Sequence, residues 1–308
     1  RGIHQQLGRH PCSVRERIPL ILDCKIKRTA TAGDFSAVAY FFGDLLQRSL
    51  DVPVGLIHCS WSASKIETWM DKETLQHFPE VQLPDINQAE FEWPAGTPTL
   101  LWNAMVNPWK GFPVKGVIWY QGEANTPDPA LYKKLFPAMV SQWRNFFHNA
   151  EMPFYYVQIA PHKYGNSRNI NSALLQEAQM KALQTIPNSG MIPTIDVGDE
   201  FCIHPPQKNV VGLRLANLAL TKTYGLHKFP STGPMMTKVE YSKNKAIVTL
   251  DNAPSGLAPG NCELEGFEIA GADKKFYPAK ARIAGRTRNV EVWSDQVAQP
   301  VAVRYAFR

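Results

Sequence analysis

The segment Val117-Ile-Trp-Tyr-Gln-Gly-Glu-Ala-Asn125 joins an apolar run to a polar loop. Its first four residues are β-branched or aromatic, which favours a buried strand. Three hydrogen-bonding side chains, Gln121, Glu123 and Asn125, then follow around a glycine. Ligands of parallel sheets bind at the carboxyl ends of the strands. The segment therefore predicts a strand that carries a functional site at one edge of a parallel sheet.

Helical and strand-like patterns alternate on both sides of this strand. Helices are expected over residues 35–46, 71–78, 99–109, 129–147, 171–185 and 208–224, and strands over 52–57, 114–120, 154–159 and 191–196. Asp34 is the expected N-cap of the first helix, and Gly225 is the expected stop of the last. Such alternation is typical of a parallel sheet with helices on both faces. The predicted fold class is therefore α/β.

The pattern changes after Pro230, where short runs of β-branched and aromatic residues are separated by Gly, Pro and Asn. The expected strands cover residues 245–250, 267–270, 290–293 and 301–307. Alternation with a period of two indicates a small antiparallel module that begins near Lys238. The expected domains are thus a basic segment at 1–33, an α/β domain at 34–228 and a β-rich accessory module at 229–308.

Composition narrows the class of protein. The chain has 308 residues, of which 44% are hydrophobic, enough for a large core. No apolar run approaches the roughly 18 to 20 residues of a membrane span. The net charge is +6, but residues 1–28 hold seven basic and two acidic residues, which account for five of these charges. The remainder is nearly neutral, so nucleic acid is not an expected partner.

A second polar segment, Ile203-His204-Pro205, follows an acidic stretch and precedes a helix. Asp196, Asp199 and Glu200 lie just before it. A histidine in such a loop can act as a general base. Ester hydrolysis by a serine enzyme needs a nucleophilic hydroxyl, a base, an acid that orients the base, and oxyanion donors. Together the two polar segments suggest an acyl-transfer site with His204 as its base.

Metal and disulfide chemistry have no matching pattern. The five cysteines show no Cys-x-x-Cys spacing, and the histidines show no His-x-x-x-His spacing. These spacings are typical of zinc sites. We therefore expect neither a metal nor an organic cofactor.

At several segments in order the chain resembles the sialate O-acetylesterase family, a branch of the SGNH or GDSL hydrolases. The resembling segments are 35–43, 54–57 with Ser60-Trp61 and 66–69, 101–105, 115–123, 202–205 and 214–216. The resemblance covers about Asp34 to Phe307. It implies an SGNH-like three-layer domain followed by a β module. It also implies a carbohydrate esterase that hydrolyses O-acetyl esters of sialic acids or related glycans without a cofactor. An extracytoplasmic location is implied too, although no signal peptide is visible.

The chain departs from the family in two places. The family nucleophile is the serine of a Gly-Gln-Ser-Asn-Met segment ahead of residue 35, and the sequence contains no such segment. We therefore expect an incomplete domain without its first strand, inactive as it stands. The family's Ser-Trp-Gly-Gly is Ser60-Trp-Ser-Ala63 here, where close backbone approach and a positive φ favour glycine. The rival interpretation of both departures is a non-catalytic glycan-binding relative.

Several residue roles remain alternatives. Glu123 is the preferred acid for His204, because a carboxylate at the end of a buried strand needs a partner; Asp196, Asp199 and Glu200 are the others. Gln121 and Asn125 either donate to the substrate or oxyanion or brace their loop.

Ser62, Trp61, Trp119 and Tyr120 are the expected substrate-binding residues, with core packing as the alternative for the aromatic side chains. The local serines Ser60, Ser62 and Ser64 lack a Gly-x-Ser-x-Gly pattern, which argues against a nucleophile among them.

Overall fold

The computed structural model describes residues 33–307, except 34, 86, 88–90, 166–169, 228–230, 258–262 and 286. The expected basic segment at 1–33 therefore lies, apart from Gly33, outside the described residues. The chain divides into two compact units: residues 1–162 with 174–216, and residues 163–173 with 217–308. The division after residue 216 comes earlier than the expected boundary at 228.

The first unit is built on a parallel sheet. Its strands are β1 (Val117–Trp119), β2 (Phe154–Val157) and β3 (Ser189–Ile192), in the order β1-β2-β3. Both neighbouring pairs are parallel. Every residue of β2 is buried, as expected of a central strand covered on both faces. The parallel sheet predicted from the sequence is confirmed.

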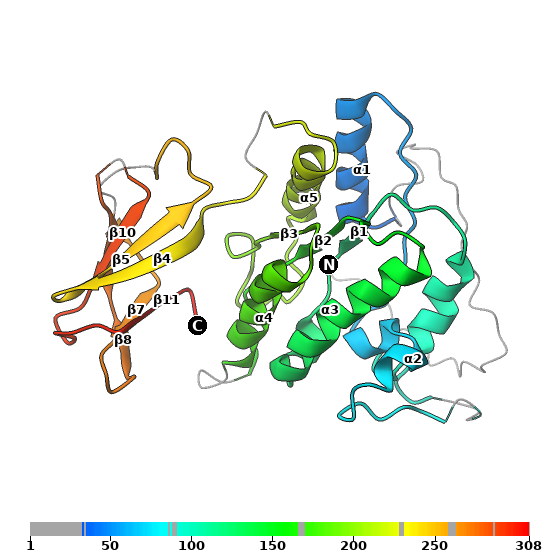
Figure 1. Ribbon diagram of the computed structural model, residues 1–308, viewed down its shortest axis with the longest axis horizontal. Coiled ribbons are helices and arrows are strands. Elements are labelled where there is room, and N and C mark those ends of the chain that lie inside the picture. Colours follow the sequence, from blue (N-terminus) through cyan, green and yellow to red (C-terminus); the bar gives the residue numbers. More distant parts are fainter. Residues whose placement is uncertain are drawn as a thin grey trace, which may run out of the picture. The chain divides into compact units, whose positions relative to one another are not determined.

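Helices cover both faces of this sheet. The long ones are α1 (Ala37–Leu50), α3 (Pro129–Phe146), α4 (Asn171–Thr185) and α5 (Lys208–Lys222). Figure 1 shows α1 and α5 on one side of the strands and α3 and α4 on the other. Helices α1 and α5 pack closely, because a Cβ at Gly212 would lie 2.6 Å from the carbonyl oxygen of Val38. The three-layer α/β architecture is thus confirmed.

The shorter helical elements differ from the expected ones. Residues 71–78 form only the turn α2 (Lys72–Leu75), preceded by η1 (Ile66–Trp69). Residues 99–109 contain η2 (Trp102–Val106) and η3 (Asn107–Trp109), and η4 (Glu123–Asn125) follows β1. The N-cap of α1 is Ser36, whose hydroxyl accepts a hydrogen bond from the amide of Ala39 at 3.3 Å, and not Asp34.

The expected strand at residues 52–57 does not form. This segment pairs with no strand in the described part of the chain. Val52 is 48% exposed and Ile57 is 39% exposed. A β-branched segment becomes a strand only when a neighbouring strand satisfies its backbone groups. The sequence pattern is that of a strand, but no strand of the described residues pairs with it.

The second unit is rich in antiparallel strands, as expected. They are β4 (Met235–Ser242), β5 (Lys245–Asp251), β6 (Glu263–Leu264), β7 (Phe267–Ala270), β8 (Phe276–Pro278), β9 (Lys280–Ile283), β10 (Asn289–Trp293) and β11 (Ala302–Tyr305). They form one sheet in the order β4-β5-β10-β9-β6 and another in the order β11-β7-β8. The sequence pattern missed β4, the longest strand of this unit, and the shorter β6, β8 and β9.

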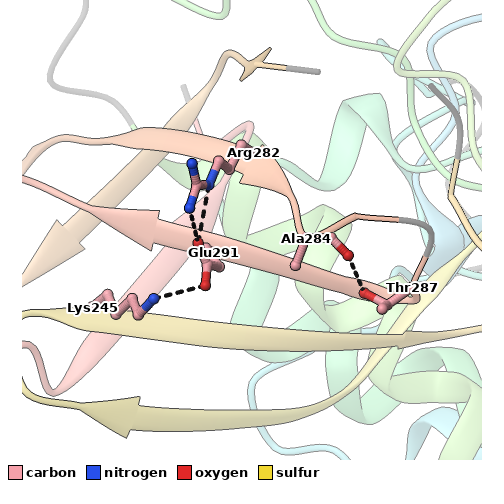
Figure 2. Close-up of polar contacts among 5 residues, drawn as sticks. All are labelled: Lys245, Arg282, Ala284, Thr287 and Glu291. Carbon is pink, nitrogen blue, oxygen red and sulfur yellow. Dashed lines mark hydrogen bonds and ion pairs between the residues drawn. The ribbon is translucent and has the colours of Figure 1, made fainter. Parts of the chain in front are cut away.

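The two faces of the larger sheet differ in polarity. Ala246, Val248, Val290 and Val292 are buried on the core side. On the other face, the carboxylate of Glu291 accepts hydrogen bonds from Lys245 at 2.7 Å and from Arg282 at 2.9 and 3.0 Å (Figure 2). The cation of each neighbouring strand thus neutralises one shared carboxylate, and these bonds hold the pKa of Glu291 below its usual range.

None of the helices in the described residues is long and apolar enough to cross a membrane.

Candidate functional site

Glu123 and His204 lie on two loops that leave the same edge of the parallel sheet. Glu123 begins η4 directly after β1, and His204 lies in the exposed loop before α5. Burial raises the pKa of the half-buried Glu123 carboxyl, and the charges of His204 and Lys208 act in the opposite direction. Because the strands of this sheet are parallel, the loops after β1 and β3 leave the same edge. The sequence singled out residues of both loops.

Two of the other candidate acids already have partners. Both carboxylate oxygens of Asp196 accept hydrogen bonds from Arg214, at 2.8 and 2.5 Å, and these bonds lower the pKa of Asp196. Asp199 accepts from the backbone amides of Phe201 at 2.7 Å and Cys202 at 2.9 Å. These two carboxylates hold the loop in place, which leaves Glu123 and Glu200 as the candidate partners of His204.

Gln121 and Asn125 use their amides inside the protein. Gln121, 7% exposed, donates through Nε2 to the carbonyl oxygen of Ser64 at 2.8 Å and to Oδ1 of Asn125 at 2.7 Å. Asn125, 4% exposed, accepts from the amide of Ile66 at 2.9 Å and donates to Oε2 of Glu67 at 2.8 Å. Both Nε2 protons of Gln121 are thereby used. These are the contacts of the loop-bracing interpretation rather than of substrate donors.

Sequence reasoning missed two residues of this network. Glu67 lies in segment 66–69, one of the segments that resemble the esterase family, and this resemblance could have indicated it. Gln179 is fully buried on α4, and its amide joins two strand ends, donating to the carbonyl of Gln121 at 3.1 Å and accepting from the amide of Ile159 at 2.9 Å. A glutamine within a helix carries no comparable sequence signal.

Ala63 stands where the resembling family has glycine, and its backbone has the positive φ expected at that position. Ala63 has a φ of 54°, in the left-handed region that favours glycine. Ser62 and Trp61 beside it are exposed, and the Trp61 side chain is 40% exposed. The loop thus keeps the left-handed backbone at a position where the resembling family has glycine.

A serine and a histidine meet elsewhere on this loop. The Ser60 hydroxyl lies 2.6 Å from Nε2 of His58, and both residues are exposed. Residues two apart in an extended segment face the same side, and this spacing could have indicated the contact from the sequence. The Ser64 hydroxyl, by contrast, is buried and accepts from the indole nitrogen of Trp69 at 3.0 Å. Ser60 is therefore the local serine with an activating base in contact.

The aromatic side chains expected to bind substrate differ in burial. Trp119 is only 7% exposed and packs against Trp69 and Trp143 at centroid distances of 5.9 and 5.8 Å. Its assignment to substrate binding is therefore wrong, since its side chain points into the core. Tyr120 is half-buried under the Lys208 ammonium, and burial and the Glu123 charge raise its pKa.

Within the described ranges, no three or more His, Cys, Asp or Glu side chains are grouped to hold a metal.

The parallel sheet, the following β module and this pair of loops define a carbohydrate esterase architecture of the SGNH type. A solved carbohydrate acetylesterase from Xanthomonas citri has the same fold, with a TM-score of 0.79 and 40% identity. That likeness covers 90% of this chain and 61% of the other.

Residues 13–221 match the family described as carbohydrate esterase, sialic acid-specific acetylesterase, and the chain belongs to this family. The match begins ahead of Asp34, where the resemblance was expected to start.

Curated relatives agree with this assignment. Mouse sialate O-acetylesterase is 30% identical over 257 residues, covering 70% of this chain and 48% of the relative. Human sialate O-acetylesterase is 31% identical over 232 residues, covering 70% of this chain and 44% of the relative. The chain thus spans about half the length of the curated relatives it matches.

Proposed function

We propose that the protein serves the hydrolysis of O-acetyl esters on sialic acids or related glycans. His204 acts as the general base, and Glu123 orients it and stabilises its protonated form. The observation that carries this proposal is that Glu123 follows β1 and His204 lies between β3 and α5, so that both loops leave the carboxyl edge of one parallel sheet. The names of the related esterases support the substrate class. An extracytoplasmic location belongs to the same proposal.

The chemistry follows a serine-esterase scheme. A serine hydroxyl attacks the acetyl carbonyl while His204 takes its proton, and the same proton then passes to the departing sugar oxygen. Water repeats the sequence on the acetyl-enzyme and releases acetate. The negative charge on the carbonyl oxygen needs donors from the backbone. The exposed loop at residues 61–63, with Ala63 held left-handed, is the segment that we assign to this task.

We further propose that these 308 residues do not supply the serine, so that the chain alone is inactive. Two observations support this. The sequence contains no Gly-Gln-Ser-Asn-Met segment. Residues 52–57 are also extended and apolar without a strand partner among the described residues, and their backbone groups suit an additional strand.

Ser60 is the local competitor for the role of nucleophile, because His58 lies 2.6 Å from its hydroxyl. Ser141 is a control, since it is an exposed serine on α3 with no role assigned in the site. We expect both Ser60→Ala and Ser141→Ala to leave any residual ester cleavage unchanged. Loss of activity in Ser60→Ala alone would assign the nucleophile to Ser60.

A glycan-binding relative without catalysis is the second candidate, favoured by the Ser62 and Ala63 replacements and by the exposed Trp61 ring.

The experiment that decides between the two candidates uses the chain preceded by a strand that ends in Gly-Gln-Ser-Asn-Met. Acetate release from O-acetylated N-acetylneuraminic acid is followed by proton NMR. The esterase proposal expects release that His204→Ala abolishes. Binding of the sugar without release would support the second candidate.

A further inference from the structure

A cavity of about 310 Å³ lies in the first unit, and neither Glu123 nor His204 lines it. Its volume is at the lower end of the range for small-molecule sites, about 300 to 1,000 Å³. Three parts of the chain line it: residues 71–73, residues 83–84 and residues within 99–107. The polar side chains of the lining are those of Asp71, Lys72, Glu73, Thr99, Asn103 and Asn107. The cavity therefore suits a small polar ligand.

Two side-chain amides of this lining are available to a ligand. Thr99, Asn103 and Asn107 recur every four residues along one helical segment, and all three line the cavity. Asn103 and Asn107 are exposed, and neither side chain has a hydrogen-bond partner in the part of the chain that the structure describes. Asp71, by contrast, already accepts a hydrogen bond from the amide of Thr74 at 2.7 Å. Each free amide offers two donor hydrogens and one accepting oxygen, which is the combination that sugar hydroxyls require.

The backbone that carries these amides departs from regular geometry. Thr99 is 3% exposed and has a φ of 71°, a left-handed conformation that a β-branched residue rarely adopts. Trp102–Val106 (η2) then form a π-helical turn. Both kinds of irregularity occur preferentially at ligand-binding and catalytic sites. They are a second indication, independent of the cavity, that this segment binds a ligand.

Hydrogen bonds connect the wall of this cavity to the loop after β1. The Thr99 amide donates to the carbonyl oxygen of Glu67 at 3.1 Å, and Oε2 of Glu67 accepts from the Asn125 amide at 2.8 Å. Asn125 follows Glu123 by two residues and ends η4. The cavity and the loop of the candidate acid are therefore fixed to each other through one residue, Glu67.

We propose that this cavity is a second saccharide site, which binds a neutral sugar unit of the substrate glycan. This inference rests on the glycan substrate proposed above. Residues 83–84 and Trp102 give the lining an apolar part, which suits the C–H face of a sugar ring. Asp71 and Glu73 place two carboxylates in the lining against the one ammonium of Lys72. This excess of negative charge favours a neutral sugar over an anionic one such as sialic acid.

The test measures sugar binding by the 308-residue chain with saturation-transfer-difference NMR. The neutral probes are the methyl glycosides of galactose, N-acetylgalactosamine and glucose, and the anionic probe is the methyl glycoside of N-acetylneuraminic acid. We expect saturable binding of at least one neutral probe at millimolar concentration. Asn103→Ala and Asn107→Ala should each weaken it about threefold to tenfold, the effect of losing one or two hydrogen bonds. Asn145→Ala is the matched control, because Asn145 is an exposed asparagine on α3, and it should leave the affinity unchanged.

Three results would overturn the inference: no saturable binding of any neutral probe, binding that both asparagine variants leave unchanged, or tighter binding of the anionic probe that depends on the same two amides. Circular dichroism checks the fold of each variant, and Asn107→Ala decides the question should Asn103→Ala misfold. The measurement requires no turnover. A failed esterase proposal would therefore leave sugar binding at this cavity intact, and a failed second site would leave acetate release by the extended chain intact.

Discussion

Nδ2 of Asn125 donates a hydrogen bond to Oε2 of Glu67 at 2.8 Å and so joins the loop after β1 to η1. The other end of the same amide accepts from Ile66 and Gln121. One buried side chain thus fixes the loop that carries Glu123 against the loop that we assign to the oxyanion. The relative position of these two loops depends on the hydrogen bonds of Asn125.

Asn125→Ala should destabilise the chain by about 2–4 kcal/mol, because it leaves the buried Glu67 carboxylate and two buried donors without a partner. Urea denaturation followed by circular dichroism measures the loss. Asn145→Ala, at an exposed position of α3, is the control and should change stability by less than about 0.5 kcal/mol. Equal effects of the two variants would refute the bracing role.

Ala63→Gly should raise stability by about 0.5–1 kcal/mol. The left-handed backbone costs alanine more than glycine, and the larger flexibility of unfolded glycine offsets only part of the gain. Ala138→Gly, within α3, should instead lower stability by at least about 0.5 kcal/mol. Thermal unfolding of both variants gives the comparison, and a destabilised Ala63→Gly would contradict the assigned backbone conformation.

Gly122→Ala should cost at least about 2 kcal/mol. The φ of 153° strains any other residue, and a Cβ there would lie 2.6 Å from Cγ2 of Ile159 and 2.9 Å from Cδ2 of Leu175. Gly55 has open space around its Cβ position, so Gly55→Ala should change stability by less than about 1 kcal/mol. Chemical denaturation distinguishes the two; a tolerated Gly122→Ala would show that the loop after β1 is not closely packed.

The raised pKa of Glu123 predicts a pH-dependent effect of Glu123→Gln. The folded chain binds this proton more tightly than the unfolded chain, in which a glutamate titrates near about 4.3. Stability therefore falls as pH rises from that value through the folded pKa. Glu123→Gln should be more stable than wild type at pH 8, with the difference shrinking toward pH 4. A constant difference between these pH values would argue against a raised pKa.

The sequence predicted the parts of the fold that repeat a local pattern. Helix α4 has the expected bounds, and β1 lies within its expected range, because periodicity and apolar runs determine both. Residues 52–57 show the limit of this reasoning, since strand formation also needs a partner that local pattern does not reveal. The antiparallel module was likewise recognised without four of its strands, β4, β6, β8 and β9.

At the site, the sequence singled out His204 and Glu123 because polar residues follow apolar strands there. The direction of the Gln121 and Asn125 amides depends on residues far away in the sequence, such as Ser64 and Glu67. Trp119 shows the same difficulty. An aromatic side chain suits both sugar binding and core packing, and only its neighbours in the fold distinguish the two.

Hydrolysis of 4-nitrophenyl acetate tests the central claim, a His204 and Glu123 pair that lacks its serine, most directly. The comparison uses the 308-residue chain, the chain preceded by a strand that ends in Gly-Gln-Ser-Asn-Met, and the extended chain with His204→Ala. We predict no turnover above buffer for the first, turnover for the second, and a return to background for the third. Removal of a nucleophile costs serine hydrolases roughly a millionfold in kcat. Turnover by the unextended chain that survives His204→Ala would contradict both the missing serine and the role of His204.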